Sequence, residues 1–137
     1  MQNGTYCVTI CTKDRHFLFG DVTDGTMVLS ENGEHARRCI EMIETIYPTI
    51  LLDGYVVMPN HVHLLLVLLD FNVNPSLQRV IRQYKSAVTK QIGFSPWQDS
   101  SYVSAILTAR KNRIIRRYIQ ENPARWDTDK FNVREGE

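Results

Sequence analysis

The hydrophobic pattern of the chain changes repeatedly between the two-residue period of strands and the longer period of helices. Tyr6, Val8 and Ile10 alternate with threonines and cysteines, which predicts a half-buried first strand. Residues 64–69 are apolar at every position, which indicates a strand buried on both faces. A turn signal of Asp, Thr and Gly occupies residues 20–25. The predicted strands cover residues 5–11, 17–19, 26–29, 49–58, 61–69 and 102–107.

Three amphipathic stretches predict helices. Ser30 can cap the first, Pro75 and Ser76 open the second, and Pro123 stops the third. The predicted helices cover residues 30–46, about 75–92 and 108–122. The major elements follow the order strand, helix, strand, strand, helix, strand, which is a split βαβ unit. We therefore expect an α+β, ferredoxin-like sandwich: an antiparallel sheet with helices on one face, plus an appended C-terminal helix. This fold leaves the activity open.

Composition is that of one ordinary globular domain. The chain has 137 residues, of which 43% are hydrophobic and 23% charged. We assign residues 1–126 to a single domain and residues 127–137 to a short polar tail, a candidate for disorder. The sequence shows neither a membrane-spanning stretch nor a signal peptide, so we expect a cytoplasmic protein without a membrane partner. Three cysteines without metal-ligand spacing indicate reduced structural thiols.

The net charge of +1 conceals a strong separation of charge. Residues 75–118 hold nine basic residues and one acidic residue, together with several aromatic residues. Cationic groups and stacking faces in one segment suit a strand of nucleic acid. Two solvated basic helix faces would give the same count, so this alternative stays open. The candidate DNA contacts are Arg82, Lys85, Arg110, Lys111, Arg113 and Arg117.

Two histidines carry the clearest chemical signal. His61 and His63 are separated by one residue at the start of the predicted buried strand, so both side chains project from the same face. This arrangement can chelate a metal ion, although two hydrogen-bonded structural histidines would have the same spacing. Tyr118 and Asn122 lie one turn apart on the last predicted helix. Tyr118 could belong to the core, and Asn122 could simply end the helix before Pro123.

Residues 55–63, Tyr-Val-Val-Met-Pro-Asn-His-Val-His, and residues 118–123, Tyr-Ile-Gln-Glu-Asn-Pro, together resemble the HUH single-strand transposases that use one catalytic tyrosine. The similarity is greatest to the branch associated with repetitive extragenic palindromes and extends over most of the chain. Many relatives have an aspartate-histidine pair where this chain has Tyr102, Val103 and Ser104.

The resemblance implies a role for each matching position. His61, His63 and Asn122 would hold Mg²⁺ or Mn²⁺, and Tyr118 would attack a phosphodiester of single-stranded, hairpin-forming DNA. The attack would leave a 5′-phosphotyrosine and a free 3′-hydroxyl. A tyrosine with a pKa near 10 needs such electrostatic help at neutral pH. The family contains monomers and also dimers that exchange the tyrosine helix, and the sequence does not choose between them.

Three alternatives accompany this prediction. Tyr84 is a rival nucleophile on another helix, but no polar ligand candidate follows it by one turn. The chain could be a replication initiator or relaxase with the same metal and tyrosine, although such proteins are usually larger. It could also be a ferredoxin-like nucleic-acid-binding module or a decayed transposase that keeps the fold without catalysis.

Overall fold

The computed structural model describes residues 4–69 and 76–132. Pro75, where the sequence predicts a helix to begin, and residues 133–137 of the predicted tail lie outside the described residues. In the part that is described, no helix is long and apolar enough to cross a membrane.

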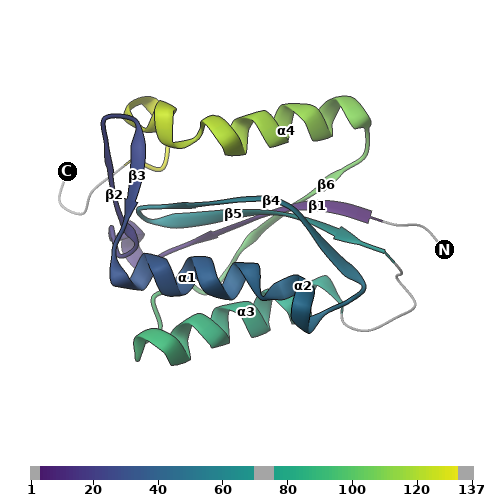
Figure 1. Cartoon of the computed structure of the whole chain (residues 1–137), viewed down its shortest axis with the longest axis horizontal. Coiled ribbons are helices and arrows are strands. Elements are labelled where there is room, and N and C mark those ends of the chain that lie inside the picture. Colours follow the sequence, from purple (N-terminus) through teal and green to yellow (C-terminus); the bar gives the residue numbers. More distant parts are fainter. Residues whose placement is uncertain (1–3, 70–75, 133–137) are drawn as a thin grey trace.

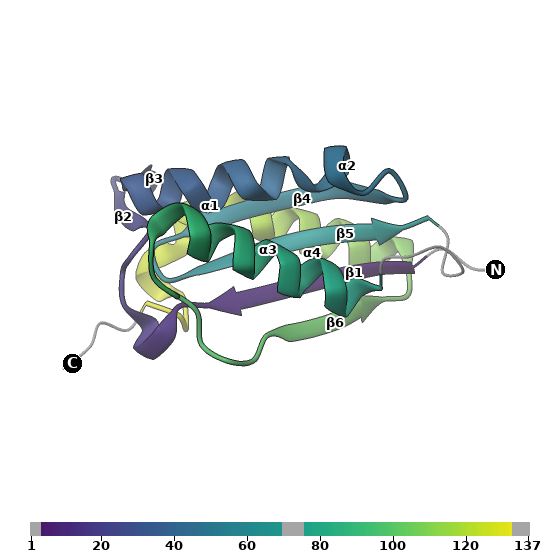
Figure 2. The ribbon, with the colours of Figure 1, turned by 90° about the horizontal axis from the view of Figure 1, so that it is seen from below.

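One antiparallel sheet of four strands forms the centre of the fold, and its spatial order is β4-β5-β1-β6. Its strands are β1 Gly4–Cys11, β4 Ile50–Met58, β5 His61–Leu68 and β6 Tyr102–Ile106. The helices α1 Glu31–Glu41, α2 Ile43–Ile46 and α3 Leu77–Ile92 lie on one face of the sheet, and α4 Ala109–Glu121 lies on the other (Figures 1 and 2). The ferredoxin-like sandwich with an appended helix is therefore confirmed.

The predicted helix starts coincide with side-chain caps. Ser30 accepts a hydrogen bond from the backbone of Gly33, Ser76 from Arg79, and Thr108 from Lys111. These contacts satisfy backbone N–H groups that have no partner within the helix. The first predicted helix is interrupted at Met42, where α1 ends and the short α2 begins.

The segment before α1 differs from the prediction. Residues 20–25 do not form a simple turn but belong to a hairpin of β2 Gly20–Thr23 and β3 Thr26–Leu29. Asp24 and Gly25 make its tight turn with φ angles of 52° and 74°. No strand forms at residues 17–19: the backbone of Phe19 bonds to Pro59 and Ser30, and its side chain fills the core with an exposure of 0%.

Strand β5 divides its side chains between the two faces of the sheet. Val62, Leu64 and Leu66 pack into the main core beneath α1 and α3. Leu65 points the other way and packs against Ile119 of α4. Cover on both faces explains why this strand is apolar along its length. It also places the side chains of the odd-numbered residues, His61 and His63 included, on the α4 side.

Candidate active site

Both histidines are buried and fixed by hydrogen bonds. His61 has an exposure of 0% and His63 of 4%. The Nδ1 atom of His61 lies 2.9 Å from Oδ1 of Asn60, which can only accept a hydrogen bond, so His61 carries its proton on Nδ1. Nδ1 of His63 lies 2.8 Å from the hydroxyl of Thr9 on the adjacent strand β1. These contacts leave Nε2 of each ring available.

Three atoms in the described ranges are buried side-chain N or O atoms without a hydrogen-bond partner: Nε2 of His61, Nε2 of His63 and Oδ1 of Asn122. Leaving a buried polar atom unpaired costs about 1–3 kcal/mol, so three such atoms in one place call for an explanation. They are two imidazole nitrogens and one amide oxygen, which are common ligands of divalent metals. The residues therefore fit the metal that the resemblance implies.

Electrostatics keeps both imidazoles neutral. Burial lowers the pKa of His61 well below 6.5, and the neighbouring His63 lowers it further, while Asn122 opposes the shift. Burial, followed by the charge of Lys130, lowers the pKa of His63 to about 4. A neutral imidazole is the form that binds a metal. Over residues 4–69 and 76–132, no three His, Cys, Asp or Glu side chains form a metal-binding group, and the candidate for a third ligand is the unpartnered amide oxygen of Asn122.

Asn122 ends α4 and is held by the segment that follows. Its side-chain amide donates a hydrogen bond of 3.0 Å to the carboxylate of Asp129, and the Asp129 carboxylate also accepts from the backbone of Phe131 at 2.8 Å. Asn122 itself is 1% exposed. A helix-ending residue without a further role does not need this burial or this support.

Tyr118 lies beside the histidines of its own chain. Its ring centroid is 5.4 Å from that of His63, at an interplanar angle of 62°. Burial, followed by the charge of Asp129, raises the pKa of Tyr118, while the nearby side chain of Asn122 opposes the rise. The hydroxyl is therefore protonated at neutral pH. With 36% exposure, Tyr118 borders a pocket instead of the core.

Helix α4 is attached to the sheet by apolar and charged contacts. Ile115 and Ile119 pack with Leu65 of β5. Arg116 forms an ion pair with Asp53 of β4, in which its Nε lies 3.2 Å from Oδ2. These contacts hold α4 against the sheet (Figure 1), with Tyr118 beside His63 of the same chain.

The segment after α4 contributes to the site, which sequence reasoning missed. Residues 127–132 were assigned to the polar tail, yet Phe131 is buried and its ring centroid is 4.3 Å from that of His61. Asn60 donates a hydrogen bond of 2.6 Å to the backbone oxygen of Phe131. The ring of Trp126 also stacks with that of His61, with 6.1 Å between the centroids. In the sequence, the only sign of this contribution is that Phe131 is a large apolar residue within the otherwise polar stretch 127–132.

A pocket of about 1010 Å³ opens beside these residues. Three cationic side chains line it: Arg15 and Lys130 lie over the ring of Phe131, 4.9 and 5.2 Å from its centroid, and Arg125 is the third. The sequence-based basic segment ends at residue 118 and includes none of these three. The pocket is lined by Cys7, Thr9, Arg15, His63, Tyr102, Ile114, Ile115, Tyr118, Asn122, Arg125, Thr128, Asp129, Lys130 and Phe131.

The predicted DNA contacts divide between two faces of the sheet. Four of them are exposed on α4: Arg110, Lys111, Arg113 and Arg117. Arg82 is exposed on α3, which lies on the opposite face. Lys85 donates hydrogen bonds of 3.0 and 3.3 Å to the backbone oxygens of Gln98 and Asp99, so its ammonium group fastens a loop. The basic segment of the sequence is therefore not one surface.

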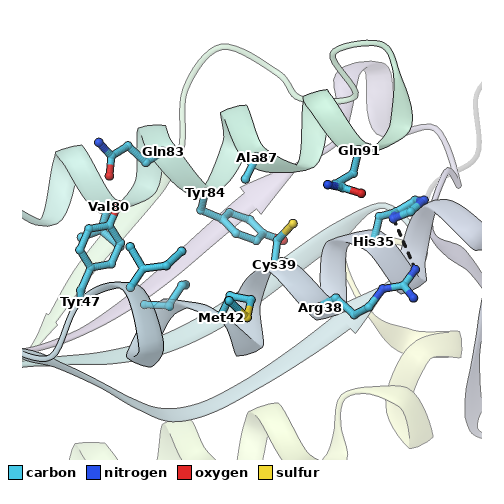
Figure 3. Close-up of a pocket in the computed structure, with 12 residues that line it drawn as sticks. His35, Arg38, Cys39, Met42, Tyr47, Val80, Gln83, Tyr84, Ala87 and Gln91 are labelled. Carbon is cyan, nitrogen blue, oxygen red and sulfur yellow. Dashed lines mark hydrogen bonds between the residues drawn. The ribbon is translucent and has the colours of Figure 1, made fainter.

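Tyr84 is far from the histidines in the fold. Its hydroxyl donates a hydrogen bond of 3.1 Å to the backbone oxygen of Ala36, and burial raises its pKa well above 10. Figure 3 shows the ring between α1 and α3, pointing toward Cys39 at a cavity of about 300 Å³. This cavity lies on the face opposite α4, so Tyr84 shares no surface with His61 and His63.

Comparisons with known proteins identify the fold. No protein-family model matches the chain. Among curated proteins, an uncharacterized protein of Haemophilus influenzae is 27% identical, over 96% of this chain and 87% of its own length. A REP-associated tyrosine transposase bound to a REP hairpin matches with a TM-score of 0.72 and 21% identity, over 91% of this chain and 69% of the other. A candidate transposase of Deinococcus radiodurans matches with a TM-score of 0.58 and 20% identity, over 88% and 91%. The chain thus has the fold of the HUH tyrosine transposases.

Proposed function

We propose that this protein is a transposase that cleaves and rejoins single-stranded DNA through Tyr118. The observation that carries the proposal is the convergence of three unpartnered buried ligand atoms, from His61, His63 and Asn122, next to an accessible tyrosine. A module that only binds nucleic acid has no use for this arrangement. The structural relative bound to a REP hairpin supports a hairpin-forming substrate.

The proposed chemistry is the one that the resemblance to the HUH transposases implies for Tyr118. The hydroxyl oxygen of Tyr118 attacks the phosphorus of a phosphodiester, the P–O3′ bond breaks, the tyrosine proton goes to solvent, and the 3′-oxygen takes up a proton. The products are a 5′-phosphotyrosine and a free 3′-hydroxyl. Attack by a 3′-hydroxyl reverses the step, so the strand is rejoined without ATP. Mg²⁺ or Mn²⁺ bound by the three ligands would polarise the phosphate and neutralise the developing charge.

The residues of the chain itself do the remaining work. The hydrogen bond to Asn60 directs the free nitrogen of His61 into the site, and burial keeps both imidazoles uncharged. The ion pair of Arg116 with Asp53 holds the tyrosine helix on the sheet. Arg15, Arg125 and Lys130 supply positive charge for the phosphates beside the attacked bond.

Covalent capture tests the proposal. A library of hairpin oligonucleotides with random single-stranded flanks is incubated with the protein and Mn²⁺, denatured, and examined for protein–DNA adducts. We expect an adduct with the unaltered protein and none with Tyr118→Phe. Tyr84→Phe is the matched control, because it removes a tyrosine hydroxyl on the face of the sheet opposite α4. This variant should form the adduct. DNA binding without any adduct would instead favour a non-catalytic binding module.

A further inference from the structure

A row of three side chains crosses the sheet at the level of the site. Tyr102 of β6 is paired with Thr9 of β1, and Thr9 is paired with His63 of β5. Residues paired across an antiparallel sheet project from the same face, so all three point toward α4. Adjacent strands lie about 4.8 Å apart, which puts Tyr102 about 10 Å from His63 along this row.

Tyr102 and Ile114 both line the pocket that Tyr118 borders. They are 54% and 51% exposed, so each presents a large apolar surface to solvent. The cationic side chains Arg15, Arg125 and Lys130 line the same pocket. A single pocket therefore offers apolar and aromatic surface together with positive charge.

A nucleotide of single-stranded DNA has matching parts, since its base is a flat apolar surface and its phosphate is an anion. We propose that Tyr102, in the pocket that Ile114 also lines, is a stacking subsite for the nucleobase adjacent to the phosphodiester that Tyr118 attacks. The proposal rests on the proposed function and adds to it a residue that positions the substrate. Stacking on a tyrosine ring is possible for every base, so the subsite fixes the path of the strand without selecting its sequence.

The position of Tyr102 in β6 favours a base over a second copy of the chain as the occupant. A partner strand would add along the outer edge of β6, whereas the Tyr102 side chain stands on the sheet face and lines the pocket of the nucleophile. Val103, the next residue, is 47% exposed and projects from the opposite face, which makes it a matched control.

The first experiment measures stacking without chemistry. The probe is a dT strand of about 12 nucleotides with one central 2-aminopurine, bound to the Tyr118→Phe protein. We expect binding to quench the 2-aminopurine emission. The emission should stay quenched when Tyr102→Phe or Val103→Ala is added, and it should rise when Tyr102→Ala is added. Anisotropy of a terminal dye establishes equal occupancy. Equal emission with Tyr102→Ala and its parent at equal occupancy would overturn the proposal.

The second experiment separates this proposal from the proposed function. With an oligonucleotide captured by the unaltered protein, Tyr102→Ala should slow adduct formation by about 5- to 150-fold, as expected for the loss of one base–aromatic stack. Oligonucleotides that each lack one base are then compared. The oligonucleotide that lacks the base next to the cleavage site should form the adduct as slowly as Tyr102→Ala does with the complete strand. With that oligonucleotide, Tyr102→Ala should not slow the reaction further. Failure of the unaltered protein to form any adduct contradicts the function, whereas additive losses at every position contradict the subsite alone. A change in oligomeric state with Tyr102→Ala, seen by size-exclusion chromatography, would assign the residue to an interface instead.

Discussion

The side-chain amide of Asn122 donates a hydrogen bond of 3.0 Å to the carboxylate of Asp129, and its carbonyl oxygen remains without a partner. An asparagine side chain can face either way, and this bond fixes which end is available beside His61 and Tyr118. Asp129 therefore determines whether α4 presents an oxygen or an N–H group to the site.

Removing the Asp129 carboxylate should weaken metal binding. Asp129→Ala frees the Asn122 amide to rotate, and loss of a group that orients a ligand commonly lowers metal affinity by about 10- to 100-fold. Titration of Mn²⁺ into the protein, followed by calorimetry, measures the change. Asp127→Ala is the control, because Asp127 is exposed and should leave the affinity unchanged. Equal affinity of the two variants would show that Asp129 does not orient a metal ligand.

Asn60 has two roles that two substitutions can separate. Its oxygen accepts from His61, and its amide donates to the backbone oxygen of Phe131. Asn60→Ala should lower both Mn²⁺ affinity and the free energy of unfolding, the latter by about 1–3 kcal/mol. Asn60→Asp keeps the acceptor for His61 and should retain more of the affinity while still losing stability. Urea unfolding and Mn²⁺ titration test this; identical Mn²⁺ affinities of the two variants would contradict it.

The metal-free protein should lose stability in mild acid. Burial lowers the pKa of His61 well below 6.5 and that of His63 to about 4. At pH values between these lowered pKa values and 6.5, the unfolded chain therefore binds more protons than the folded chain. The free energy of unfolding is therefore highest above pH 6.5 and falls as the pH drops toward 4. Each histidine contributes up to about 1.4 kcal/mol per pH unit. Urea unfolding at pH 7 and pH 5 should show the loss, and His63→Gln should reduce it; a flat profile would refute the prediction.

Basic residues on the two faces of the sheet should differ in their effect on DNA binding. Each phosphate contact adds about 0.7 to the slope of log affinity against log salt for a single strand. Arg113→Gln on α4 should reduce this slope, measured by fluorescence anisotropy with a hairpin that has a single-stranded flank. Arg82→Gln on α3 supplies the comparison. An equal reduction by both would mean that the DNA extends around the sheet to α3.

A single chain should carry the complete site. Tyr118 lies beside His63 of its own chain, so mixing Tyr118→Phe with His63→Ala should not restore adduct formation. If the tyrosine helix acted on a partner's histidines, the mixture would pair an intact tyrosine with an intact metal site. Adduct yield of the mixture, relative to each variant alone, decides between the two arrangements, and recovery would show exchange of the helix.

Much of the architecture could be predicted from local patterns. The apolar run of β5 and the caps Ser30, Ser76 and Thr108 act within a few residues, so the sequence displays them directly. The hairpin of β2 and β3 was harder, because its strands are short and its core residue Phe19 lies just before them.

The candidate site was only partly visible. The spacing of His61 and His63 and that of Tyr118 and Asn122 are local, whereas Asn122 meets Asp129 only after the chain has turned through η2, Pro123–Thr128. The count of basic residues along the sequence does not map onto one surface for a related reason. It added residues of α3 and α4 that the intervening sheet separates, and it omitted Arg15, which reaches the pocket from the segment after β1.

The alternation of side chains along β5 has a consequence for engineering the protein. His61 and His63 face the site, whereas Val62 and Leu64 face the core, so neighbouring positions of one strand serve different purposes. Residues beneath α1 and α3 can therefore be redesigned for thermal tolerance while the chemistry above stays unaltered. A shift of the strand by a single residue would exchange the two sets and destroy both at once. Faithful strand pairing is thus the feature that a redesigned variant has to preserve first.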